Sequence, residues 1–259
     1  WRDNPLYSLL KQSYLLNSRF LTDLVEAPDL DDATRHRLRF YMRQFIDAMS
    51  PANSAVTNPD VIRLAIESKG ASLRAGFENL QADLRKGGLT ITDEAAFEIG
   101  RNVATSEGAV VFENELMQLI QYAPLTETVA SRPLVIVPPC INKFYILDLQ
   151  PDNSFVRHAV QQGHTVFLVS WRNPDASAAH LTWDDYVEQG AIKALAVARE
   201  IAGVDQVNAL GWCVGGTLLS TALAVLAARG DPSVASLTLL TTMLDFRDPG
   251  DLGVFIDEA

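Results

Sequence analysis

A cysteine stands between glycines in the segment Gly211-Trp212-Cys213-Val214-Gly215-Gly216. An apolar run precedes this segment, and a helical pattern follows it. A thiolate is a strong nucleophile that forms covalent acyl intermediates. A turn from a strand into a helix places the side chain beside the positive end of the helix dipole, which stabilises an anion. The residue types and their spacing therefore indicate nucleophilic catalysis through Cys213.

The spacing around Cys213 is that of the G-x-nucleophile-x-G turn of α/β-hydrolases, with Cys in place of Ser. The nucleophile in such a turn has a strained backbone, and the glycines let neighbouring elements approach without a clashing Cβ. The N–H of Val214 is one expected oxyanion donor. The alternative interpretation is an unreactive buried cysteine, because free cysteine is often buried. The expected strand before the turn and the helix after it favour the nucleophile.

A second oxyanion donor is expected from the loop that follows an earlier strand. Here the loop begins after Val137. Pro138 and Pro139 have no N–H, so an N–H near Cys140 or Ile141 is the candidate. Cys140 could be a second thiol near the site, but we expect it to pack, which is the more common role of such a cysteine.

The second half of the chain alternates short apolar runs with helical patterns. The apolar runs are Leu134–Val137, Val166–Val169, Val207–Leu210 and Leu237–Leu240. The helical patterns are Asn153–Gln162, Asp184–Ile201 and Val214–Arg229, with Gly230 suited to end the last helix. Apolar strands that alternate with helices indicate a parallel sheet covered on both faces.

The first half is mainly helical in pattern, with apolar residues at helical spacing from Pro5 onward. Thr92 is a candidate N-cap for a further helix, and residues 108–122 fit a helix or a strand equally well. We therefore predict a mainly helical N-terminal domain over residues 1–125. Residues 126–259 are predicted to form the first half of an α/β-hydrolase catalytic domain with a mostly parallel sheet.

The composition argues against several classes of function. The chain has 21 Lys and Arg against 32 Asp and Glu, a net charge of −11, which disfavours nucleic-acid binding on a basic surface. The sequence has no uninterrupted run of about 18 apolar residues, the length needed to span a membrane. Two cysteines are too few for a disulfide scaffold and fit a reducing compartment. No residues have metal-ligand spacing, so we expect neither a metal nor a cofactor. The chain does not begin with Met, and we expect a piece of a longer protein.

Two long segments carry a more specific signal. PPCINKFYILDLQPDNSFVRHAVQQGHTVFLVSWRNPD and LGWCVGGTLLSTALAVLAARG closely resemble class I polyhydroxyalkanoate synthases, and the resemblance extends over the whole chain. It implies polymerisation of (R)-3-hydroxyacyl-CoA, with 3-hydroxybutyryl-CoA as the best candidate substrate. Cys213 is then the acylated nucleophile, and Val214 and Ile141 are the oxyanion donors. The resemblance also implies a cytoplasmic homodimer that binds the growing polyester chain and associates with polyester granules.

The remaining members of a catalytic triad are not found in the expected order. The acid and the histidine follow the nucleophile in this fold, whereas all histidines precede Cys213: His36, His158, His164 and His180. Further strands should also separate the nucleophile from the acid. We therefore interpret the aspartates after Cys213 as loop carboxylates: Asp245, Asp248, Asp251 and Asp257. The resemblance implies that the acid and base lie beyond Ala259 and that this chain is inactive alone.

Two other hypotheses stay open for the function. One is a hydrolase with a cysteine nucleophile, such as a thioesterase or a lactone hydrolase. The other is a non-enzymatic interaction module that acts through the helical half. The turn Trp171-Arg172-Asn173-Pro174-Asp175 also has two interpretations, a structural turn held by side-chain hydrogen bonds or a substrate contact.

Overall fold

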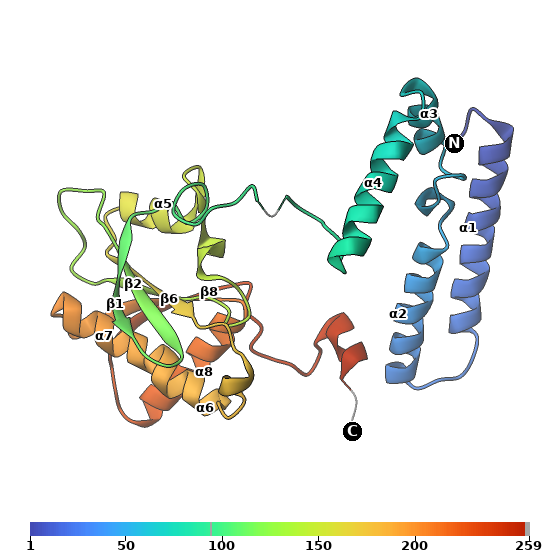
Figure 1. Ribbon diagram of the computed structural model, residues 1–259. Coiled ribbons are helices and arrows are strands. Elements are labelled where there is room, and N and C mark those ends of the chain that lie inside the picture. The colour runs from blue at the N-terminus through green and yellow to red at the C-terminus, as the bar shows by residue number, and fades with distance from the viewer. Residues whose placement is uncertain (94, 257–259) are drawn as a thin grey trace. The chain divides into compact units, whose positions relative to one another are not determined.

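The computed structural model describes residues 1–93 and 95–256 (Figure 1). The chain divides into two compact units. One contains residues 1–92 together with the segment from Arg247 onward, and the other contains Asp93–Phe246. Each unit has its own architecture and is described by itself.

The first unit is helical. Its helices are α1 (Pro5–Glu26), α2 (Asp32–Ala48), α3 (Pro59–Glu67) and α4 (Ala71–Lys86), with short 3₁₀ segments η1 (Pro51–Asn53) and η5 (Gly250–Phe255). The helix starts follow from side chains that satisfy free N–H groups. Asn4 accepts from the N–H of Leu6, and Asp31 accepts from the N–H of Thr34, both over 2.9 Å.

Helices α1 and α2 pack against each other as a hairpin. The Tyr14 hydroxyl donates to the carbonyl of Ile46 over 3.1 Å, and Arg39 forms a two-point ion pair with Glu26. Within the same unit, segment η5 lies against α2. The Arg43 guanidinium donates to the carboxylate of Asp251 over 2.7 Å.

The second unit is built on a six-stranded sheet. The strands are β1 (Gly108–Glu113), β2 (Met117–Tyr122), β3 (Leu134–Val137), β6 (Val166–Trp171), β7 (Val207–Trp212) and β8 (Val234–Leu240). Their order is β1-β2-β6-β3-β7-β8. Strands β6, β3, β7 and β8 are parallel, whereas β1 and β2 form an antiparallel hairpin that joins the sheet along β6. The chain crosses from one side of β3 to the other between β6 and β7, which places the topological switch point at the carboxyl ends of β3 and β7.

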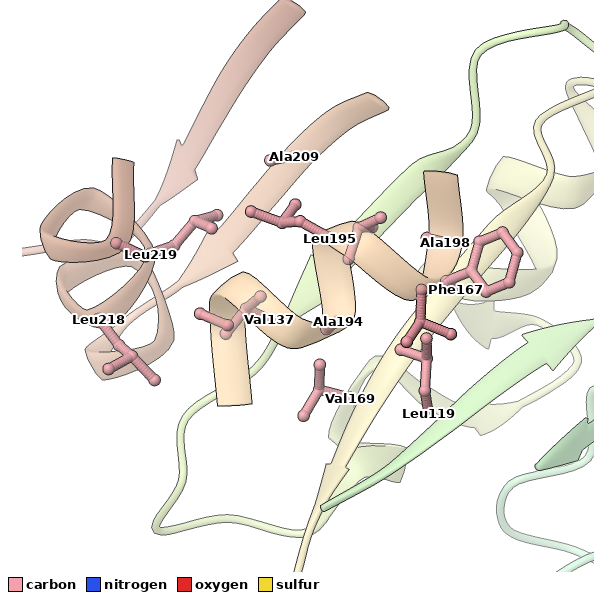
Figure 2. Close-up of a cluster of buried hydrophobic side chains, with 14 of the residues drawn as sticks. Leu119, Val137, Phe167, Val169, Ala194, Leu195, Ala198, Ala209, Leu218 and Leu219 are labelled. Atoms are coloured by element: carbon pink, nitrogen blue, oxygen red, sulfur yellow. The ribbon is translucent and has the colours of Figure 1, made fainter. Parts of the chain in front are cut away.

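Helices cover both faces of the sheet, as expected when apolar strands alternate with helices. On one face, α7 (Lys193–Ala202) and α8 (Val214–Ala228) bury the larger cluster, in which Val137, Leu195 and Leu219 meet (Figure 2). On the other face, α5 (Phe155–Gln161) packs on a second cluster. A small antiparallel pair, β4 (Asp148–Gln150) and β5 (Asn153–Ser154), precedes α5.

The helix before β7 is not a regular α-helix throughout. A short α6 (Trp183–Asp185) continues into a π-helical segment, η4 (Tyr186–Ile192), and then into α7. The capping box of Thr182 and Asp185 starts it, and Gly203 with φ 64° ends it. The sequence pattern predicted one helix over Asp184–Ile201, and the structure confirms its place but adds the π turn. Such turns occur frequently at functional sites.

The predicted mostly parallel sheet and the helical N-terminal region are both confirmed. All four predicted strands form, and Gly230 has the left-handed φ of 71° that a helix end requires. Residues 108–122, which the periodicity left undecided, are strands β1 and β2. These two strands belong to the sheet, although they precede residue 126, where the catalytic domain was predicted to begin. The domain boundary between residues 125 and 126 stays a prediction.

The helix expected after Thr92 does not form in the described part of that segment. Residues 95–98 are turn, bend or irregular backbone, and the Asp93 side chain accepts from the N–H of Ala95 over 3.0 Å. A local side-chain hydrogen bond of this kind competes with helix formation. The prediction of a helix start at Thr92 was therefore wrong.

Candidate active site

Cys213 occupies a sharp turn between β7 and α8. Its backbone has φ 53° and ψ −127°, a strained conformation for a residue with a side chain. Hydrogen bonds hold it there: its N–H donates to the Leu240 carbonyl over 2.9 Å, and its own carbonyl accepts from the N–H groups of Gly216 and Thr217. The backbone conformation expected of a nucleophile turn is therefore present.

The three glycines of the turn are required by close packing. A Cβ at Gly211 would lie 2.4 Å from the Cα of Gly216. A Cβ at Gly215 would lie 2.2 Å from the Val137 carbonyl oxygen, and one at Gly216 would lie 2.0 Å from Oγ1 of Thr242. Side-chain atoms cannot occupy such distances, so β3, β7 and the segment after β8 can meet at the turn only because these residues are glycines.

The loop that follows β3 leaves the sheet beside the turn. Val137 is paired with Gly211 in parallel register, so the chain passes from β3 into Pro138 at the same edge where β7 passes into Cys213. Val214 is the first residue of α8, and its N–H is one of those that have no partner inside a helix. Ile141 lies in the loop and is 75% exposed. The oxyanion roles of Val214 and Ile141 remain predictions.

Cys140 lies in the same loop and is half-buried. It packs against the larger hydrophobic cluster together with Tyr186, and burial raises the pKa of its thiol. Both observations agree with the predicted packing role. A neutral, packed thiol is a poor nucleophile.

Trp171, the last residue of β6, connects that strand to the loop after β3, and no pattern in the sequence marked its side chain. The Trp171 Nε1–H donates to the Pro138 carbonyl over 2.8 Å, and the bond is buried. The residues that follow form a turn: the Arg172 guanidinium donates to Asp175 over 3.3 Å and to the Ser177 hydroxyl over 3.0 Å. These contacts agree with the structural interpretation of that turn. Hydrogen bonds from Ser177, and then the charge of Arg172, lower the pKa of Asp175.

The four histidines lie on separate elements. His36 is on α2 with Nε2 3.6 Å from the carboxylate of Asp251, and His180 is in a loop with Nε2 3.9 Å from Glu115. His158 is on α5 and His164 precedes β6, so His164 lies at the edge of the sheet opposite the turn. Among the described residues, no hydrogen bond joins any of these histidines to Cys213.

The aspartates after β8 that the structure describes have interaction partners. Asp251 accepts from Arg43, and Asp248 accepts from the N–H of Gly250 over 3.2 Å. Asp245 also has an interaction partner. Asp257 lies outside the described residues. In residues 1–93 and 95–256, no group of three or more His, Cys, Asp or Glu side chains is arranged to hold a metal ion. None of the helices in that part of the chain combines the length and apolarity needed to cross a bilayer.

Comparison with known families agrees with this geometry. Residues 1–159 match the family described as poly-beta-hydroxybutyrate polymerase (PhaC) N-terminus. The chain belongs to this family. Residues 133–258 match the alpha/beta hydrolase fold, which confirms the predicted fold of the sheet that carries Cys213.

Curated relatives of the PhaC family match along the whole chain. It is 63% identical over 259 residues to the poly(3-hydroxyalkanoate) polymerase subunit PhaC of Cupriavidus necator, and covers 44% of that protein. It is 48% identical over 264 residues to the poly(3-hydroxyalkanoate) polymerase of Methylorubrum extorquens, again 44% of that protein. The chain thus spans less than half the length of these PhaC relatives.

Proposed function

We propose that this chain carries the nucleophile of a polymerase that converts (R)-3-hydroxyacyl-CoA into polyhydroxyalkanoate and releases CoA. 3-Hydroxybutyryl-CoA is the proposed substrate. The observation that carries the proposal is the strained backbone of Cys213 between β7 and α8, in a chain whose relatives are named poly(3-hydroxyalkanoate) polymerases.

The proposed chemistry begins with attack of the Cys213 thiolate on the carbonyl carbon of the thioester. The C–S bond to CoA breaks, CoA leaves as its thiol after it takes a proton, and an acyl-Cys213 forms. The N–H groups of Val214 and Ile141 are the proposed donors to the oxyanion. The hydroxyl of a second acyl unit then gives its proton to the general base and attacks the carbonyl carbon of the acyl-enzyme. The C–Sγ bond to Cys213 breaks, the Cys213 thiolate is released, and the ester that forms extends the chain.

The proton transfers need an acid and a base. All four histidines of this chain precede Cys213, whereas the histidine follows the nucleophile in hydrolase-type triads. We propose that the triad Asp and His belong to the part of the complete protein that follows residue 259. The measurements below therefore use the complete protein.

The proposed partners are the growing polyester chain, the surface of a polyester granule and a second copy of the protein. Exposed apolar side chains of the helical unit support the granule contact. Leu16 and Phe20 lie four residues apart on α1 and are 70% and 62% exposed, so they share one face of the helix. Replacing both with Gln is expected to reduce co-sedimentation of the complete protein with granules. Unchanged co-sedimentation would argue against this surface.

The test of the proposed function is product analysis after incubation of the complete protein with (R)-3-hydroxybutyryl-CoA. We expect insoluble polyester and free CoA. Release of free 3-hydroxybutyrate without polymer would instead support the alternative, a thioesterase or lactone hydrolase with the same cysteine nucleophile. The absence of both products, together with retained granule binding, would support a non-enzymatic interaction module.

A further inference from the structure

Trp171 is the last residue of β6 and is 7% exposed. A buried indole N–H needs an acceptor, and here the acceptor is the Pro138 carbonyl at 2.8 Å. Pro138 is the first residue of the loop after β3, and it cannot donate a backbone hydrogen bond of its own. The indole therefore fixes the carbonyl at the point where the loop begins.

The same peptide group is confined on its other side by the nucleophile turn. The Cβ position of Gly215 lies 2.6 Å from both the carbonyl carbon and the carbonyl oxygen of Pro138. Gly215 is the second residue of α8, two residues after Cys213. The Pro138 peptide is thus held between the Trp171 indole and the first turn of the helix that begins at the nucleophile.

The indole itself is held in one orientation. A Cβ at Gly190 would lie 2.6 and 2.7 Å from the Cη2 and Cζ3 atoms of Trp171. The ring of Tyr186 lies at a centroid distance of 5.5 Å. Both neighbours belong to the π-helical segment η4, which therefore shapes the space that the indole occupies.

We propose that Trp171 is a positioning residue that sets the place of the loop 138–142 relative to Cys213, and that it acts without touching substrate. The inference rests on the proposed function, because its purpose is to hold a loop N–H where the oxyanion of the thioester forms. Acylation needs that oxyanion to be stabilised. Alkylation of Cys213 by iodoacetamide is a direct displacement and forms no oxyanion. Its rate therefore reports the reactivity of the thiol and does not depend on an oxyanion donor from the loop.

The test compares Trp171→Phe with Trp183→Phe in the complete protein. Trp183 is 42% exposed on α6 and serves as the matched control. With (R)-3-hydroxybutyryl-CoA, Trp171→Phe is expected to lower kcat for CoA release about tenfold or more, since loss of a whole oxyanion donor costs about 10²–10³. KM is expected to change less than about twofold, and the rate of Cys213 alkylation is expected to stay the same.

Two further variants keep the test informative if Trp171→Phe does not fold. Site-specific replacement of Trp171 by 3-benzothienylalanine removes only the N–H and is expected to lower kcat in the same way. Gly190→Ala leaves every polar group in place but moves the indole, so it is also expected to lower kcat. Gly76→Ala is its control, because Gly76 is also helical and, apart from its chain neighbours and the backbone of its own helix, nothing lies within 4 Å of its Cβ position.

An unchanged kcat in the benzothienylalanine variant would overturn the inference. A parallel loss of kcat and of Cys213 alkylation would also overturn it, because Trp171 would then support the nucleophile turn as a whole. Failure of the proposed function has a different signature: CoA release that survives Cys213→Ala would remove Cys213 as the nucleophile, whatever the result at Trp171.

Discussion

The backbone N–H of Cys213 donates a hydrogen bond to the carbonyl oxygen of Leu240 over 2.9 Å. This contact ties the strained turn after β7 to the last residue of β8. The neighbouring strand therefore helps to hold Cys213 at a positive φ that a residue with a side chain rarely adopts. The turn at Cys213 is therefore held by β8 as well as by its own residues.

Replacement of each cysteine tests whether Cys213 is the nucleophile, as proposed, and whether Cys140 only packs. Cys213→Ala is expected to abolish CoA release from (R)-3-hydroxybutyryl-CoA in the complete protein, because no acyl-enzyme can form. Cys140→Ala is expected to keep most of the activity, since Cys140 packs against the larger cluster. A spectrophotometric assay of free CoA measures both. The reverse result would indicate that Cys140, in the loop after β3, is the nucleophile.

The glycines of the turn are expected to differ in how much alanine destabilises the fold. Gly215→Ala places a Cβ 2.2 Å from backbone, which cannot move aside, and we expect a loss of about 3 kcal/mol or more in the free energy of unfolding. Gly216→Ala meets the side chain of Thr242, and we expect about 1–3 kcal/mol. Urea unfolding measures both losses.

The side chain at position 242 provides the control for this prediction. Thr242→Ala removes the Oγ1 and Cγ2 atoms that the Cβ of Gly216→Ala would meet at 2.0 and 2.7 Å. Combined with Gly216→Ala, Thr242→Ala should restore part of the lost unfolding free energy. Combined with Gly215→Ala, it should restore none. Equal rescue of the two variants would contradict the packing argument.

Asp148 is a buried carboxylate that holds the segment before β1 to the β4 strand. It is 1% exposed, and it accepts from the N–H and the hydroxyl of Ser106 over 3.1 and 2.7 Å and from the Ser154 hydroxyl over 2.6 Å. Asp148→Asn removes acceptor capacity and should cost about 3 kcal/mol of unfolding free energy. Asp152→Asn, at an exposed position, should change it by less than about 0.5 kcal/mol. Equal effects in urea unfolding would contradict the role of Asp148.

The Tyr122 hydroxyl is buried and has no hydrogen-bond partner among the described residues. Burial, and then the charge of Asp148, raise the pKa of Tyr122, so the hydroxyl stays neutral. Tyr122→Phe removes an unsatisfied polar group and is expected to leave the unfolding free energy unchanged or to raise it by about 1 kcal/mol. Tyr41→Phe, at a 52% exposed position, is the comparison. A clear loss of stability in Tyr122→Phe would show that the hydroxyl is satisfied.

The reactivity of Cys140 should depend on pH in a defined direction. Burial raises the pKa of its thiol, so the folded state favours the neutral form. The contribution of the neutral thiol to the free energy of unfolding is fully present below the ordinary thiol pKa of about 8.5. It is lost as the pH rises through the higher pKa that the thiol has in the folded protein. In Cys213→Ser, the iodoacetamide reaction at Cys140 should therefore have its midpoint above that of the urea-unfolded chain. A midpoint at or below the unfolded value would contradict this prediction.

Local pattern in the sequence was sufficient to predict much of this protein. The apolar runs located β3, β6, β7 and β8, because buried parallel strands are apolar on both faces. The strained turn at Cys213 was also predictable, because its glycines and Cys213 are contiguous and their conformations are local requirements. The family resemblance followed from the same contiguous segments.

The tertiary structure alone decided which distant residues meet. Strands β1 and β2 formed within residues 108–122 because β2 pairs with β6 and β1 pairs with β2, and a sequence period that fits two structures cannot decide between them. Trp171 meets Pro138 although 33 residues separate them, and Asp148 meets Ser106 across 42. These contacts depend on strand order and register, which local periodicity does not specify. The turn that carries Cys213 could therefore be predicted from contiguous residues, whereas the contacts that support the neighbouring loops depend on the folded sheet.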